Sequence, residues 1–85
     1  MNIYVGNIAY STSEDTLKAH FETIGKVGQV KIIHDRNTGR SKGFGFVTMD
    51  NEEEGRRAIS ELNGVSLDNR ELMVNEAHEK KEKNK

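Results

Sequence analysis

The chain has 85 residues, a length that supports one domain with a single modest hydrophobic core. Hydrophobic residues make up 33% of it, and the absence of cysteine excludes a disulfide framework and a thiolate metal site. The opening MNIYVGNIAY lacks the regions of a secretory signal, and no apolar run is long enough to span a membrane. We therefore expect a cytoplasmic protein without membrane contact; a nuclear location stays open if the source is eukaryotic.

The net charge of −1 and the pI near 6.3 contrast with the basic balance that is usual in nucleic-acid-binding domains. The charges are, however, unevenly distributed along the chain. Residues 31–42 carry four cations against Asp35 alone, whereas residues 50–54 (DNEEE) carry four acids. A polyanion would therefore bind to one face of the domain.

The first part of the chain changes its hydrophobic period once. Residues 2–6 (NIYVG) alternate, which predicts a short strand. Residues 11–25 begin with capping residues followed by acids, and they place Leu17, Phe21 and Ile24 at helical spacing. This segment is predicted to be a helix with one buried side.

The second half repeats the alternation of strands and helix. It predicts strands at 27–35 and 43–49 around a turn, a helix at 51–62, and a last strand near 72–75. The order is β-α-β-β-α-β, and two helices with one apolar stripe each can cover only one face of a four-stranded antiparallel sheet. The fold class expected is therefore an α+β sandwich with the other sheet face open to water.

The stretch KGFGFVTM at 42–49 places two aromatic rings on one side of a strand. Phe44 and Phe46 share a face with Lys42 and Thr48, because residues two apart in a strand point the same way. An unpaired buried ammonium group is costly, so this face is predicted to be the open one. Val47 and the alternate glycines then lie on the other face, where the glycines are expected to give room for helix packing.

The same parity places further side chains beside the two rings. Tyr4 lies opposite the apolar positions of the first strand, and Lys31 and Asn75 are expected on the open face of their own strands. Stacking of a base on an aromatic ring contributes roughly 1–3 kcal/mol, and cations contact phosphates. The predicted partner is single-stranded nucleic acid.

These residues carry a resemblance to a known family. KGFGFVTM resembles the RNP1 signature of the RNA recognition motif (RRM) family, K/R-G-F/Y-G/A-F-V-x-F/Y, at seven of its eight positions, and Met49 is the departure. IYVGNI at 3–8 resembles the RNP2 motif. The resemblance implies a ferredoxin-like RRM domain over residues 1–77, and we expect the charged tail at 78–85 to be disordered.

The resemblance also implies a ligand and roles for particular residues. It implies single-stranded RNA as ligand, with single-stranded DNA bound more weakly, and a role in post-transcriptional RNA handling. The RNA-binding residues expected from parity and resemblance together are Tyr4, Phe44 and Phe46 for stacking, Lys42, Lys31 and Arg40 for phosphate or flanking contacts, and Asn75 and Ala77 at the exit of the last strand.

These features also allow other interpretations. The rings of Phe44 and Phe46 would be buried in a two-sided sandwich, and an exposed aromatic patch would also suit a protein-binding module, with the acids at 52–54 as a docking site. GFGFVT is not a dinucleotide fingerprint, because Thr48 occupies the place of its third glycine. The histidines at 20, 34 and 78 have no metal-ligand spacing and are expected at the surface. We expect no catalytic residue, no metal and no cofactor, and a monomer that leaves room for a protein partner.

Overall fold

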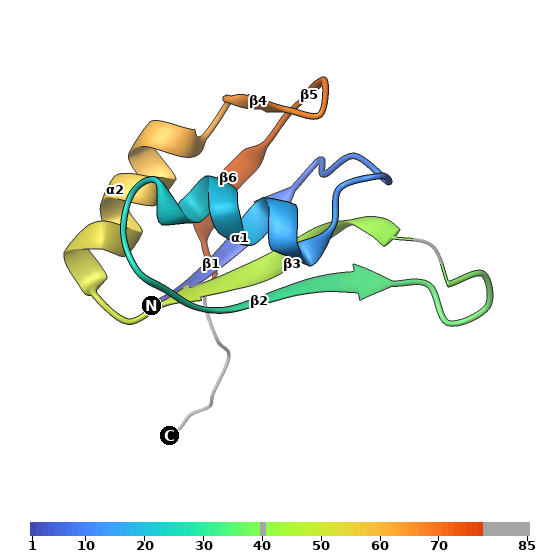
Figure 1. Cartoon of the computed structure of the whole chain (residues 1–85), viewed down its shortest axis with the longest axis horizontal. Coiled ribbons are helices and arrows are strands. Elements are labelled where there is room, and N and C mark those ends of the chain that lie inside the picture. The colour runs from blue at the N-terminus through green and yellow to red at the C-terminus, as the bar shows by residue number, and fades with distance from the viewer. Residues whose placement is uncertain (40, 78–85) are drawn as a thin grey trace.

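The computed structural model describes residues 1–39 and 41–77, with the backbone alone at Ser41 and Lys42. The elements are β1 (Asn2–Gly6), α1 (Glu14–Glu22), β2 (Val27–His34), β3 (Ser41–Met49), α2 (Glu52–Leu62), β4 (Ser66–Leu67), β5 (Arg70–Glu71) and β6 (Met73–Glu76) (Figure 1). Arg40 and the tail at 78–85, with their predicted roles, lie outside the described residues. The predicted β-α-β-β-α-β order is confirmed, with a small hairpin added before the last strand.

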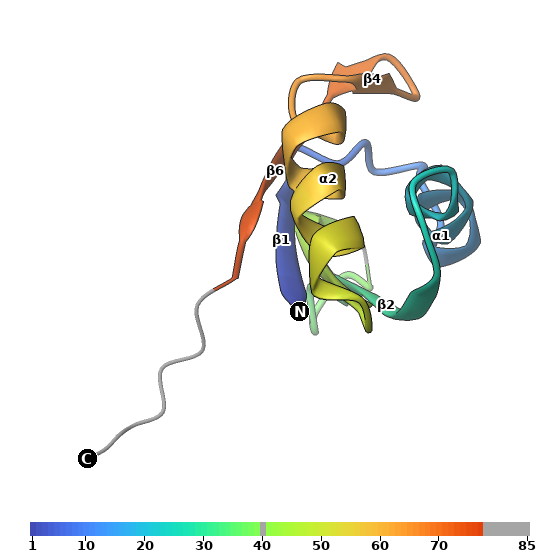
Figure 2. The ribbon, with the colours of Figure 1, turned by 90° about the vertical axis from the view of Figure 1, so that its left-hand side faces the viewer.

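The main sheet is antiparallel, with its strands in the order β2-β3-β1-β6. Both helices lie on the same side of it, so neither helix covers its other side (Figure 2). The apolar side chains between these layers form the core: Ile3, Val5, Ile8, Leu17, Phe21, Val27, Ile32, Val47, Met49, Ala58, Leu62, Leu72 and Val74. This arrangement confirms the expected α+β sandwich with one open sheet face.

Each helix begins at a side-chain cap. The Ser13 hydroxyl accepts a hydrogen bond from the Thr16 backbone N–H at 3.1 Å, so Ser13 is the N-cap of α1. Asn51 caps α2 in the same way, accepting from the Glu54 N–H at 3.0 Å. These caps fix where the helices start and hence which residues face the sheet.

Side chains also close the free edges of the sheet. The Glu14 carboxylate accepts a hydrogen bond from the backbone N–H of Ile32 in edge strand β2, at 2.9 Å. At the opposite edge, the side-chain oxygen of Asn63 (Oδ1) accepts a hydrogen bond from the backbone N–H of Val74 in β6, at 2.9 Å. Because unpaired edge groups invite pairing with another chain, each contact removes one such donor from its edge.

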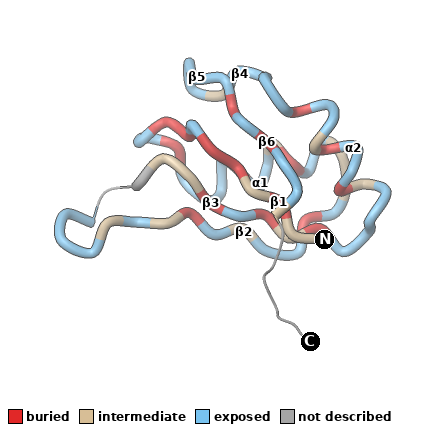
Figure 3. The backbone as a smooth tube through the Cα atoms, turned by 180° about the vertical axis from the view of Figure 1, so that it is seen from behind, coloured by how far each residue is buried: buried red, intermediate tan, exposed pale blue. Residues whose placement is uncertain are grey.

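The β4–β5 hairpin was not predicted from the sequence. Its two-residue turn is formed by Asp68 and Asn69, both with positive φ (52° and 70°), which is the geometry of a tight hairpin turn. The hairpin is mostly exposed, whereas buried positions concentrate where strands and helices face each other (Figure 3). Asp-Asn is a turn signal, but the two-residue strands beside it are too short to show a period.

The space beside Gly45 corrects one expectation. A Cβ atom on Gly45 would collide with the Lys31 carbonyl oxygen and would lie 2.9 Å from the Ile32 Cα. The tight approach is therefore to the neighbouring strand β2, where the register shifts between Ile32 and His34, and not to a helix.

We expect Gly45→Ala to destabilise the domain by about 1–3 kcal/mol, because the collision is with backbone that cannot move alone. Gly28→Ala is the matched control in β2, since its Cβ would approach the Asp50 side chain no closer than 3.2 Å. Urea denaturation of both variants measures the difference. Equal midpoints for the two would contradict this account of Gly45.

Candidate nucleic-acid interface

One row of side chains crosses the open face from edge to edge. Tyr4 in β1 lies opposite Phe46 in β3 and, on its other side, opposite Asn75 in β6. Phe46 in turn lies opposite Lys31 in β2. Strand pairing therefore brings Asn75, Tyr4, Phe46 and Lys31 into line on the face that strand parity predicted for them.

Three rings form a connected cluster on this face, here called the aromatic face: Tyr4, Phe44 and Phe46. Their ring centroids are 5.9 Å apart for Tyr4 and Phe46, 6.1 Å for Tyr4 and Phe44, and 6.3 Å for Phe44 and Phe46. These separations are typical of interacting aromatic pairs. Phe46 is 37% exposed, and the other two rings are half-buried, each shielded by its neighbours. The rings thus support one another and still present surface to a flat ligand.

Gly6 makes room for one of these rings. A Cβ on Gly6 would lie 2.7 Å from the Tyr4 hydroxyl oxygen and 3.0 Å from a ring carbon. The Tyr4 ring therefore leans over Gly6, whose register partners are Phe44 and Met73. Sequence reasoning missed this role, although a glycine two residues after an outward tyrosine is a signal for it.

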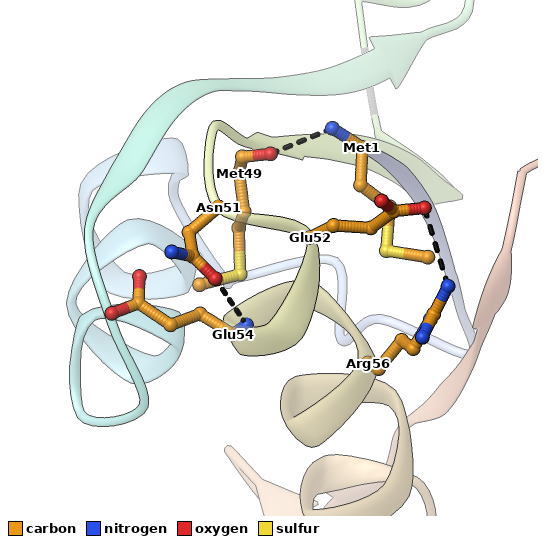
Figure 4. Close-up of polar contacts among 6 residues, drawn as sticks. All are labelled: Met1, Met49, Asn51, Glu52, Glu54 and Arg56. Carbon is orange, nitrogen blue, oxygen red and sulfur yellow. Dashed lines mark hydrogen bonds and ion pairs between the residues drawn. The ribbon is translucent and has the colours of Figure 1, made fainter.

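The covered face of β3 holds the position that departs from the RNP1 signature. Met49 and Val47 are fully buried in the core. The N-terminal ammonium group of Met1 donates a hydrogen bond to the Met49 carbonyl oxygen at 2.7 Å (Figure 4). The departure at Met49 thus concerns packing below the sheet rather than the aromatic face.

Polar residues border the aromatic face at two places. Lys31 and Asn75 are exposed at opposite edges of the sheet. Ala77 is half-buried, and its backbone N–H donates to the Asn2 carbonyl oxygen at 2.9 Å, which continues the β6–β1 pairing past β6. The backbone of Lys42 belongs to β3, whereas its predicted phosphate contact lies outside the described side chains.

Two of the acids at the start of α2, Glu52 and Glu54, contact groups within the domain. Glu52 forms an ion pair with Arg56 at 3.3 Å on the exposed side of the helix (Figure 4). The Glu54 carboxylate is half-buried and accepts a hydrogen bond from the Lys26 backbone N–H at 3.1 Å. Glu54 thereby fastens α2 to the turn before β2, a structural role that gives no support to a docking site at 52–54.

The histidines follow their predicted surface placement in part. His34 is exposed, His20 is half-buried, and His78 lies outside the described residues. Burial lowers the pKa of the His20 imidazole below its ordinary value, and the ring packs edge-on to Phe21. Within residues 1–39 and 41–77, no group of three or more metal-ligating side chains comes together. No helix in this part of the chain is long and apolar enough to cross a membrane.

The sequence model of the RNA recognition motif family matches residues 3–73, a range that includes all of the aromatic face. The chain belongs to the RNA recognition motif family. A glycine-rich RNA-binding protein of Daucus carota is 47% identical to this RRM over 74 residues, which are 87% of the chain and 47% of that protein. The chain spans between 22% and 48% of the length of such curated relatives, some of which are named as chloroplastic.

Solved structures share the fold of this RRM closely. The crystal structure of an RNA-binding protein named PG1 matches with a TM-score of 0.89 and 48% identity, over 96% of this chain and 99% of that one. The Rna15 RRM with bound RNA (GU) matches with a TM-score of 0.82 and 31% identity, over 92% of this chain and 83% of that one. These matches confirm the expected RRM fold.

Proposed function

We propose that this RRM binds single-stranded RNA on the open face of its sheet. Tyr4 and Phe46 stack on bases, and Phe44 packs against a base or sugar. The proposal rests on one observation: the adjoining rings of Tyr4 and Phe46 lie in a cross-strand row that ends at Lys31. Unpaired bases offer flat surfaces for the rings, and the phosphates beside them offer charge for the cation.

The relatives support RNA as the ligand. The plant relatives carry RNA binding or ribonucleoprotein in their names, and the similar Rna15 RRM is described with bound RNA. Single-stranded DNA offers the same bases and phosphates, and we expect it to bind more weakly. The function in the cell that follows is post-transcriptional handling of RNA.

The remaining contacts belong to the borders of the aromatic face. Lys31 contacts phosphate, and Asn75 and Ala77 contact a base at the exit of β6. Phosphate contacts by Lys42 and Arg40 rest on the family resemblance and on their place in and before β3. The base preference is set by these border residues, because stacking accepts every base.

The test is a fluorescence-anisotropy titration with randomised short single-stranded RNA and DNA at two salt concentrations. Salt-sensitive binding, tighter for RNA than for DNA, is the expected result. If the protein at high micromolar concentration leaves both ligands free, the proposal fails and a protein-binding role takes its place.

Lys31→Gln is expected to weaken RNA binding on all sequences alike. Loss of one phosphate contact to a single strand should reduce the slope of log K against log salt by about 0.7. The matched control is Lys18→Gln, which removes the same charge from the exposed side of α1. A slope that falls equally in both variants would show a general charge effect and would remove Lys31 from the phosphate contacts.

We further propose that the domain binds RNA as a monomer without catalysing a reaction, and that it acts in the cytoplasm. The names of its relatives support binding rather than catalysis, and a chain without cysteine suits a reducing compartment. A protein partner could occupy the same aromatic face in competition with RNA. Light scattering of the purified protein and fractionation of its source cells test the monomer and the location.

A further inference from the structure

Arg70 of the hairpin is held in place by Asn7, which follows β1. The side-chain amide oxygen of Asn7 (Oδ1) accepts hydrogen bonds from Arg70 Nη2 at 2.6 Å and from Arg70 Nε at 3.3 Å. The side-chain nitrogen of Asn7 (Nδ2) donates to the backbone carbonyl oxygen of Glu71 at 2.7 Å. Both ends of the amide are thus used, and its oxygen is directed at the guanidinium group.

This contact lies at one end of the aromatic face. Asn7 directly follows Gly6, whose register partners are Phe44 and Met73, and Met73 is 54% exposed on the open side. A second hydrogen bond joins the β4–β5 hairpin to the segment after β1: the Thr12 hydroxyl donates to the Asp68 carboxylate at 2.6 Å. Arg70 is therefore fixed beside the end of the sheet where Phe44 lies.

The guanidinium group retains free donors in this position. An arginine carries five N–H donors, and the Asn7 oxygen occupies only the edge formed by Nε and Nη2. Among the described residues, Arg56 and Arg57 each pair with a glutamate, whereas Arg70 is exposed and its charge has no carboxylate within ion-pair distance. Its outer edge is thus available for an anion that has two acceptor oxygens in a plane.

We propose that Arg70 binds a backbone phosphate of the RNA, so that the β4–β5 hairpin forms part of the interface. The inference rests on the proposed function and extends it beyond the four strands. Lys31 lies in edge strand β2 of the main sheet, whereas Arg70 lies in the separate β4–β5 hairpin and is joined to Asn7 just after β1, so the two cations belong to different parts of the proposed interface. RRM sheets stack two or three bases on their open face.

The fixed conformation of Arg70 favours this role. A free arginine side chain loses much rotamer entropy when it binds, and prior fixation by Asn7 reduces that loss. A purely structural role would join the hairpin to β1 and nothing more. The two roles differ in what Arg70→Gln does to the salt dependence of RNA binding.

The experiment is an anisotropy titration of a randomised single-stranded RNA at two salt concentrations, with a thermal melt of each variant. Arg70→Gln is expected to weaken binding about tenfold and to reduce the salt slope by about 0.7. Arg57→Gln, on the exposed side of α2, is the matched control and should bind as the wild type does. An unchanged slope in Arg70→Gln would leave a structural role only. A loss confined to guanine-containing RNA would make Arg70 a base contact and overturn the phosphate proposal.

Two further measurements keep the result interpretable. Asn7→Gly retains the positive φ of 57° and the charge of Arg70 but removes the fixation, so it should weaken binding about threefold at an unchanged slope. If Arg70→Gln unfolds, wild-type binding to RNA with single neutral methylphosphonate linkages still identifies the contact. One linkage should then lose affinity in the wild type and lose less in Arg70→Lys, whose ammonium contacts phosphate as a point charge without the planar fork. Absence of any wild-type binding would instead refute the proposed function itself.

Discussion

Replacing Phe44 and Phe46 together by alanine is expected to remove most RNA binding while the domain stays folded. Each stacked ring contributes roughly 1–3 kcal/mol, so the loss of two rings should weaken binding by at least about 30-fold. The domain should stay folded because neither ring belongs to the core, and Phe46 is 37% exposed. The three ring pairs contribute about 0.5–1.5 kcal/mol each, which should lower Tm by about 2–12 °C per pair.

The measurement is an anisotropy titration against one RNA, together with circular dichroism and a thermal melt of the same sample. The matched control is Tyr10→Ala, which removes an aromatic ring that is 73% exposed in the loop between β1 and α1. A double variant that loses its native circular dichroism at 25 °C would mean that the rings support the fold. Binding retained in a folded double variant would place the RNA elsewhere.

Strand parity predicted the aromatic face because its signals are local. A buried ammonium is so costly that Lys42 alone indicates which side of β3 is open, and Phe44 and Phe46 follow from a period of two. Tyr4 needed only the apolar alternation of its own strand. The pairing of Tyr4 with Phe46 and of Phe46 with Lys31 depends on strand order and register, which the sequence pattern did not predict.

The parts that escaped prediction depend on contacts between residues distant in sequence. Asn7 and Arg70 are 63 positions apart, and nothing near either of them indicates that they meet. The carboxylate of Glu14 was expected to favour the helix start, yet it also closes the edge of β2 through Ile32. Such roles arise only once the strands have a register and the loops a path.

Phe21→Ala should have the opposite profile to the double ring variant. Phe21 lies on α1, is fully buried in the core, and has His20 packed edge-on against it. Truncation of a buried phenylalanine costs about 3–5 kcal/mol. Domains of this size have a total stability of about 5–15 kcal/mol, so Tm should fall by roughly 15 °C or more.

RNA binding by the folded fraction of Phe21→Ala should be unchanged at low temperature, because the ring is buried in the core and α1 lies on the covered side of the sheet (Figure 2). Phe21→Leu is the control, since it refills most of the volume and should recover much of the lost stability. The same residue type then contributes to stability on one side of the sheet and to binding on the other. A Phe21→Ala variant with wild-type Tm and weakened RNA binding would reverse the two faces and refute the interface proposed for Tyr4, Phe44 and Phe46.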